Sequence, residues 1–131
     1  MEDWRSIKNK TKRSFKFAAE GLLYALKTQR NLRIHFFIAF LIITAGILLK
    51  INNLEFAILV LTIAVVISME LFNTAIEAGI DLVSPSNQPL AKIAKDLGAA
   101  AVLIFALASI IIGLLIFGPR LFALVTTALQ R

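Results

Sequence analysis

The sequence contains no cysteine, which excludes disulfides and thiolate chemistry and leaves the redox compartment undetermined. It also lacks a glycine-rich P-loop, a G-x-G-x-x-G pattern and an H-E-x-x-H pattern, so no soluble-kinase or metalloprotease signature is present. The N-terminal region has no short apolar core followed by a small-residue cleavage site, and we expect no signal peptide. The function therefore has to be inferred from the distribution of apolar and charged residues.

Charged residues are scarce in this chain. Asp, Glu, Lys and Arg make up 17% of the 131 residues, whereas hydrophobic residues make up 59%, and the mean hydropathy is +0.84. A soluble domain of this size needs a largely polar surface, which this composition cannot supply. We therefore expect an integral membrane protein.

The few charges are unevenly placed. The formal net charge is +6, and nine basic residues precede the apolar run that opens at Ile34: Arg5, Lys8, Lys10, Lys12, Arg13, Lys16, Lys27, Arg30 and Arg33. A basic end stays cytoplasmic under the positive-inside rule and favours anionic lipid headgroups. No nucleic-acid partner is expected, because the basic segment is joined directly to membrane spans and has few features beyond its charge.

The apolar pattern predicts a single all-α membrane domain. In the basic segment, apolar residues recur at three- and four-residue steps, which is typical of an amphipathic helix on the membrane surface; packing on a soluble partner is the alternative. Three longer apolar runs predict transmembrane helices, and three spans place the C-terminus outside. The expected elements are an interfacial helix over 1–29, spans over 32–50, 54–81 and 90–118, and a tail over 119–131.

Polar side chains line one face at the end of the second span, which we expect to continue into the cytoplasm. Glu70, Asn73, Glu77 and Asp81 fall within an arc of about 80° on a helix. Such a stripe either lines a polar cavity or coordinates something positive, because lipid offers no partner to an ionised group. The helix rises about 24 Å between Leu54 and Glu70, which places Glu70 near the inner membrane boundary.

Lys95 and Asp96 precede the third span and are predicted to lie at the same depth as Glu70. Several carboxylates, an asparagine and a lysine are the groups that phosphoryl transfer uses, because carboxylates hold Mg²⁺ or accept a proton and lysine neutralises phosphate charge. A solvated surface pair of Lys92 with Asp96 is the simpler alternative. An ion pathway through the membrane is a second alternative, but the charges lie together at one interface, which argues against a relay across the membrane. His35 is expected to be an interfacial hydrogen-bonding residue rather than a catalytic one.

Three sequence motifs resemble the small bacterial membrane diacylglycerol kinase family. They are ELFNTAIEAGID at 70–81, PLAKIAKD at 89–96 and AAAV at 99–102. Two further stretches, RNLRIH at 30–35 and LVSP at 82–85, are more similar to the undecaprenol kinase branch, which is typical of Gram-positive bacteria. The resemblance covers residues 14–117.

The resemblance implies a lipid kinase of the bacterial cytoplasmic membrane that uses ATP and Mg²⁺. It also implies a homotrimer with active sites between neighbouring subunits. Undecaprenol is the preferred acceptor and diacylglycerol the alternative; a non-catalytic scaffold or small transporter with the same fold is a hypothesis of another class. By matching positions, Glu70 is the general base and Glu77 a metal ligand. The remaining residues of the nucleotide and phosphate site are Asn73, Asp81, Lys95 and Asp96.

The chain departs from the family pattern at two places. Gln29 stands where the family usually has a metal-binding glutamate, and a neutral ligand binds Mg²⁺ less strongly. Asn87 and Gln88 replace a Tyr-His pair in the loop before the third span. These departures affect the expected metal shell and the adenine contacts, but not Glu70, Glu77 or Lys95.

Overall fold

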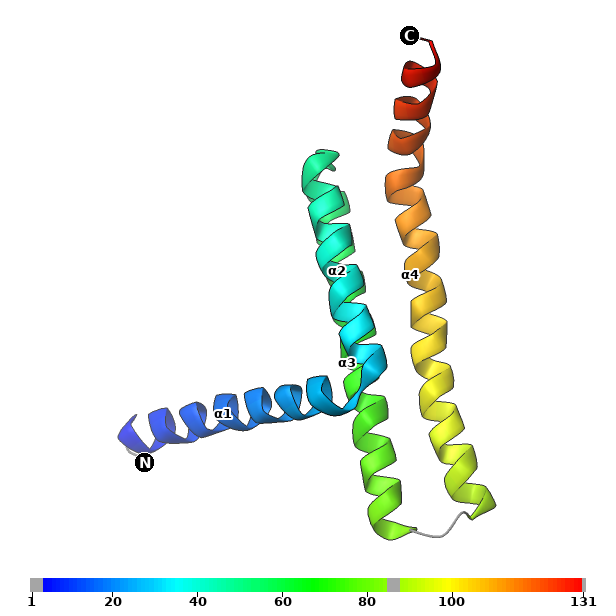
Figure 1. The fold of residues 1–131 in the computed structure, drawn as a ribbon. Coiled ribbons are helices and arrows are strands. Elements are labelled where there is room, and N and C mark those ends of the chain that lie inside the picture. The colour runs from blue at the N-terminus through cyan, green and yellow to red at the C-terminus, as the bar shows by residue number, and fades with distance from the viewer. Residues whose placement is uncertain (1–3, 85–87, 131) are drawn as a thin grey trace.

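The structure is a computed structural model that describes residues 4–84 and 88–130, with side chains from residue 8 onward (Figure 1). Its four elements are α1 (Trp4–Thr28), α2 (Arg30–Leu48), α3 (Asn53–Val83) and α4 (Pro89–Leu129). Helices α2, α3 and α4 are each long and apolar enough to cross a membrane. The predicted all-α membrane fold, with an N-terminal amphipathic helix and three further helices able to span, is therefore confirmed.

Three of the helices run side by side, and α1 projects away from them where it joins α2, while α3 and α4 continue past this junction (Figure 1). The packing is most extensive between α3 and α4, and α2 lies against α3. The core is thin: Leu59 on α3 packs with Ile116 and Phe117 on α4. Most large apolar side chains point outward, as expected for helices whose surroundings are lipid rather than water.

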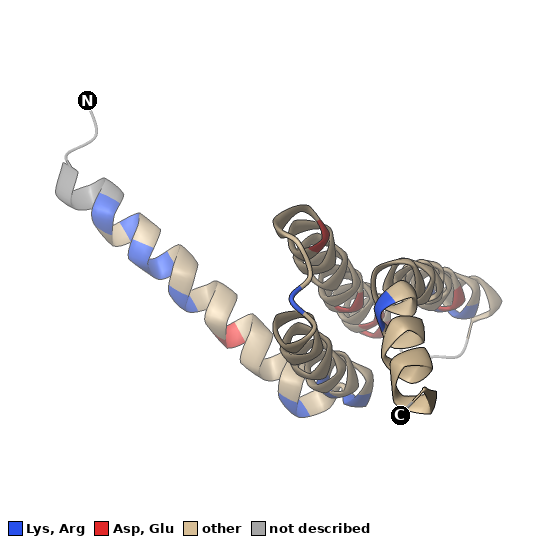
Figure 2. Ribbon diagram, turned by 90° about the horizontal axis from the view of Figure 1, so that it is seen from above, with Lys and Arg blue, Asp and Glu red and all other residues tan. Residues whose placement is uncertain are grey.

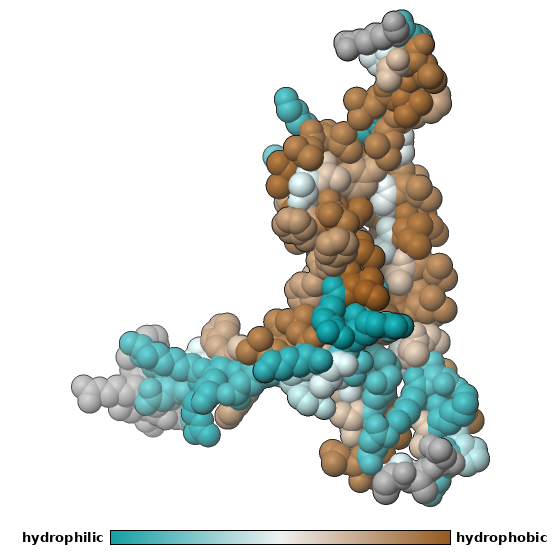
Figure 3. Space-filling model, in the orientation of Figure 1, coloured by the Kyte–Doolittle hydropathy of each residue, from teal (hydrophilic) through white to brown (hydrophobic). Residues whose placement is uncertain are grey.

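Helix α1 has the composition of a membrane-surface helix. Figure 2 shows lysines and arginines following one another along it, and Figure 3 shows hydrophilic side chains on α1 and at the adjoining end of the bundle. The guanidinium of Arg13 lies 5.9 Å from the centre of the Phe17 ring, a cation–π contact on an exposed helix. The chain turns at Gln29, whose extended backbone separates α1 from α2.

At the end of the bundle remote from α1, the Glu55 carboxylate forms hydrogen bonds with the N-cap residue of α3 and with a residue of α4. Glu55 accepts from the backbone N–H of Asn52 at 2.8 Å, while Asn52 accepts from the backbone N–H of Glu55 at 2.9 Å. This capping box satisfies the start of α3. The same carboxylate accepts two hydrogen bonds from Arg120 on α4, at 2.6 and 3.0 Å. Glu55 thus caps its own helix and ties α3 to α4.

Helix α4 continues through Pro119 to Leu129 instead of ending with the predicted third span at 118. A proline inside a helix removes a backbone donor and usually kinks or ends the helix. Arg120 follows directly and donates both to Glu55 and to the carbonyl of Ile116 at 2.8 Å. These bonds hold the chain in helical register just beyond the proline, so residues 119–129 are helical, while the end of the third span at residue 118 stays a prediction.

Candidate active site

The polar stripe predicted on the second span lies on α3 and passes from a buried end to an exposed end. Glu70 is 3% exposed and Asn73 is 9% exposed. Glu77, two turns after Glu70, is half-buried, and Asp81 is exposed. One helix face therefore presents carboxylates in two environments, and the buried member is the one nearest the apolar part of the bundle.

The Glu70 carboxylate is buried without a bonding partner. Within the described part of the chain it makes no hydrogen bond or ion pair, while its backbone carbonyl accepts from the Thr74 hydroxyl at 2.9 Å. A buried carboxylate with a free oxygen can accept a proton from a hydroxyl group that enters its site.

Asn73 fixes the next carboxylate along the stripe. Its side-chain nitrogen donates to the Glu77 carboxylate at 2.9 Å, one helical turn away. The amide oxygen of Asn73 is buried and has no hydrogen-bond partner in the structure. It faces Gly98 on α4, so this side chain is held between its own helix and the neighbouring one.

Lys95 meets Asp81 rather than Glu70. Its ammonium group forms a hydrogen-bonded ion pair with the Asp81 carboxylate, linking α4 to α3. Asp81 follows Glu70 by eleven residues, which is roughly 16 Å along a helix. The sequence predicts Lys95 at the depth of Glu70, whereas the packing of α4 on α3 brings its ammonium group to Asp81, at the exposed end of the stripe.

The other predicted site residues are more peripheral in this chain. Asp96 forms an i, i+4 ion pair with Lys92 on the surface of α4, which is the simpler alternative considered from sequence. Gln29 is half-buried at the junction of α1 and α2, and its side chain makes no capping hydrogen bond. Gln88 is the N-cap of α4, also without a side-chain capping bond, whereas Asn87 lies outside the described residues.

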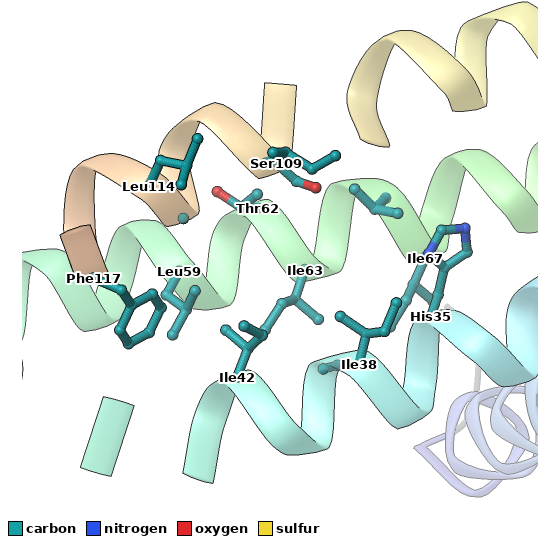
Figure 4. Close-up of a pocket in the computed structure, with 14 residues that line it drawn as sticks. His35, Ile38, Ile42, Leu59, Thr62, Ile63, Ile67, Ser109, Leu114 and Phe117 are labelled. Atoms are coloured by element: carbon teal, nitrogen blue, oxygen red, sulfur yellow. The ribbon is translucent and has the colours of Figure 1, made fainter. Parts of the chain in front are cut away.

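Two cavities lie beside α3, and neither is predicted from the sequence. One, of about 300 Å³, lies among α2, α3 and α4. Figure 4 shows His35 at one end of it and Phe117 at the other, with the hydroxyls of Thr62 and Ser109 beside an otherwise apolar lining. Lone hydroxyl residues inside predicted spans were the available signal, but which helices they face depends on packing.

The second cavity, of about 420 Å³, lies between α1 and α3. Small residues make room for it, among them Gly21 and Ala25 on α1 and Ala78 on α3. Thr74, which bonds the backbone of Glu70, also contributes to its lining. Both cavities are thus lined by residues of α3 other than the four of the stripe.

Comparison with known proteins gives consistent matches. The family model described as prokaryotic diacylglycerol kinase matches residues 16–117. The chain is 42% identical to an undecaprenol kinase from Bacillus subtilis over 120 residues, which is 92% of this chain and 98% of the relative. It is 46% identical to a diacylglycerol kinase from Synechocystis sp. over 112 residues, covering 85% of this chain and 64% of the relative. A diacylglycerol kinase from Haemophilus influenzae is 30% identical over 91 residues, covering 70% and 77% of the two chains.

Proposed function

The chain belongs to the prokaryotic diacylglycerol kinase family and is a membrane lipid kinase, and we propose that its lipid acceptor is undecaprenol. The observation that carries this choice is the match to the Bacillus subtilis undecaprenol kinase, which spans 98% of that relative. The Synechocystis diacylglycerol kinase is slightly more identical, but the chain covers only 64% of its length. Diacylglycerol is therefore the alternative acceptor.

In the proposed reaction, Glu70 is the general base. The lipid hydroxyl gives its proton to the Glu70 carboxylate as its oxygen attacks the γ-phosphorus of ATP. The bond between that phosphorus and the bridging oxygen breaks, and ADP leaves. The burial of Glu70, at 3% exposure, and the absence of a hydrogen-bonding partner among the described residues support this role, because a base must be free to take the proton.

Glu77 is the proposed ligand for Mg²⁺, and the geometry fits a nucleotide-bound ion. Magnesium is usually held by one or two carboxylates together with substrate phosphates. Asn73 holds the Glu77 carboxylate at 2.9 Å, and across the described ranges no group of three or more acidic, histidine or cysteine side chains could hold a metal by itself. The ion would neutralise charge on the transferred phosphate.

Asp81, Lys95 and Asp96 are the proposed nucleotide and phosphate contacts. The Lys95–Asp81 pair keeps a cation at the open end of the stripe, where it is available to a phosphate group. Asn73 contributes to the same site by holding Glu77. Lysine is a compact positive charge that suits this purpose.

We further propose that the active protein is a homotrimer with sites shared between subunits. In one chain the Lys95 charge sits at Asp81, roughly 16 Å beyond Glu70 along α3. The predominantly apolar outer faces of the helices support this assembly, because they offer a surface on which neighbouring chains can pack.

The acceptor is tested with purified protein in detergent, ATP, Mg²⁺ and either undecaprenol or diacylglycerol at equal mole fraction. We expect kcat/KM for undecaprenol to exceed that for diacylglycerol by about tenfold or more, because a pocket suited to one hydrocarbon discriminates against another by that order. The opposite ranking would make diacylglycerol the acceptor. No phosphorylated product from either lipid would contradict kinase activity in this chain.

Gln29→Glu should lower the Mg²⁺ concentration needed for half-maximal rate. A carboxylate at the N-cap of α2 adds a charged oxygen where the chain now has a neutral amide, and Mg²⁺ prefers charged oxygen ligands. The measurement is the rate as a function of free Mg²⁺ at saturating ATP, with Gln130→Glu, at the exposed C-cap of α4, as a control for added negative charge. An unchanged requirement in Gln29→Glu would mean that position 29 lies outside the metal shell.

A further inference from the structure

Gly98 is the point where α4 approaches the polar stripe most closely. A Cβ atom added there would lie 2.3 Å from the amide oxygen of Asn73 and 3.4 Å from its amide carbon. Non-bonded heavy atoms do not approach that closely, because repulsion rises steeply below the optimum of about 3.5 Å. Only glycine fits against Asn73 in its present position.

If the Asn73 side chain moves away from Gly98, its amide nitrogen loses the hydrogen bond to Glu77. Its nitrogen donates to Glu77 at 2.9 Å, and its oxygen, which is buried and without a conventional partner, lies against Gly98. An amide oriented at both ends in this way holds the Glu77 carboxylate in one position. The backbone of α4 can offer the orphan oxygen a weak C–H contact, which a side chain at position 98 would remove.

Gly98 is the glycine at which an added Cβ would come closest to another side chain. At Gly46 the nearest atom is Cδ1 of Ile51 at 3.0 Å, and at Gly21, Gly79, Gly113 and Gly118 nothing lies within 4 Å. Gly118 lies on α4 as well, so it separates the effect of an added methyl group on that helix from the effect of contact with Asn73.

We infer that Gly98 is a positioning residue, whose missing side chain lets Asn73 lie against α4 and hold the Glu77 carboxylate towards a divalent cation bound with nucleotide. The inference deepens the proposed function and rests on it for the ligand of Glu77. Gly98 itself touches neither metal nor substrate. A Cβ at position 98 displaces the Asn73 amide, and the displaced amide releases Glu77.

The test compares Gly98→Ala with Gly118→Ala in the full chain in detergent. One readout is the side-chain amide signal of Asn73 in ¹⁵N-asparagine-labelled protein, identified by its loss in Asn73→Ala. A second is the affinity for Mn²⁺, used as the probe in the presence of a non-hydrolysable ATP analogue and followed by electron paramagnetic resonance. We expect Gly98→Ala to shift the amide signal and weaken Mn²⁺ binding by about tenfold, the scale of losses on changing an outer-shell partner of a metal ligand. Gly118→Ala should change neither readout.

The Asn73→Ala background separates positioning from general damage to the fold. Asn73→Ala removes the atom that the new methyl group would strike. In this background, Gly98→Ala should therefore cause no further loss of Mn²⁺ affinity, and the double variant should regain any folding that Gly98→Ala alone loses. An equal loss from Gly98→Ala in both backgrounds, or an unmoved amide signal, would overturn the inference. A shifted amide signal in a protein that phosphorylates no lipid would instead retain the contact and contradict the proposed function.

Discussion

Replacing Glu70 with glutamine is expected to lower lipid phosphorylation by about a thousandfold, the middle of the range for loss of a positioned general base. Glutamine keeps the size of the side chain but cannot take the hydroxyl proton. Because Glu70 is buried without a hydrogen-bonding partner among the described residues, the substitution breaks no existing side-chain hydrogen bond. Turnover should fall while the affinity for an ATP analogue stays near that of the parent.

The control for this prediction is Glu20→Gln, which makes the same chemical change on α1. Glu20 is solvent-exposed and only loosely paired with Lys16, at 3.8 Å, so its replacement should leave turnover unchanged. Kinetics at saturating ATP and lipid separate a loss of kcat from a loss of binding. Near-normal turnover in Glu70→Gln would remove Glu70 as the base.

Lys95→Ala is expected to reduce kcat by a factor of about one hundred to one thousand, as removal of a single transition-state donor does in other enzymes. The substitution removes a positive charge from the phosphate site and leaves the Asp81 carboxylate without its ion-pair partner. Both changes disfavour a bound triphosphate. The measurement is the rate at saturating ATP, together with the affinity for an ATP analogue.

Lys92→Ala is a closely matched control for Lys95→Ala. Both lysines lie in the first turns of α4, but the Lys92 side chain is 77% exposed and its partner is Asp96, four residues later on the same helix. Such exposed pairs contribute little, so the rate should change less than about threefold. Comparable losses in the two variants would mean that net charge near the start of α4, rather than the Lys95 ammonium, determines the rate.

Mixing the two inactive variants extends the second prediction to subunit sharing. If each site takes Glu70 from one chain and Lys95 from another, oligomers of Glu70→Gln and Lys95→Ala chains will contain some intact sites. We expect partial recovery of activity after co-reconstitution. Activity no greater than the sum of the two separate variants would place both residues of a site in the same chain.

The local sequence pattern was sufficient to predict the helices and the polar stripe on α3. The places of α2 and α3 in the chain follow from the apolar runs, with ends that differ from the predicted spans by one or two residues, and the shared face of Glu70, Asn73, Glu77 and Asp81 follows from the helical period alone. Charge asymmetry likewise predicted a basic amphipathic α1. Membrane orientation of the two ends, the trimer and the roles of the stripe residues stay predictions.

Contacts between helices could not be predicted in the same way. The Glu55–Arg120 pair joins residues 65 positions apart, and it accompanies the continuation of α4 past Pro119. From the sequence, Arg120 only ends the uncharged run of the third span, and its partner on α3 cannot be predicted from composition along the chain. The cavities have the same origin, since each is the space left between helices whose spacing their side chains set.

Hydropathy and helical period were enough to predict an all-α membrane protein with three helices long and apolar enough to span, and with carboxylates along one helix face, because both are properties of neighbouring residues. The contacts of Lys95 with Asp81 and of Gly98 with Asn73 were visible only in the packed helices. Both depend on how far α4 is shifted along α3. That register is set by side-chain packing between distant segments, which no local pattern records.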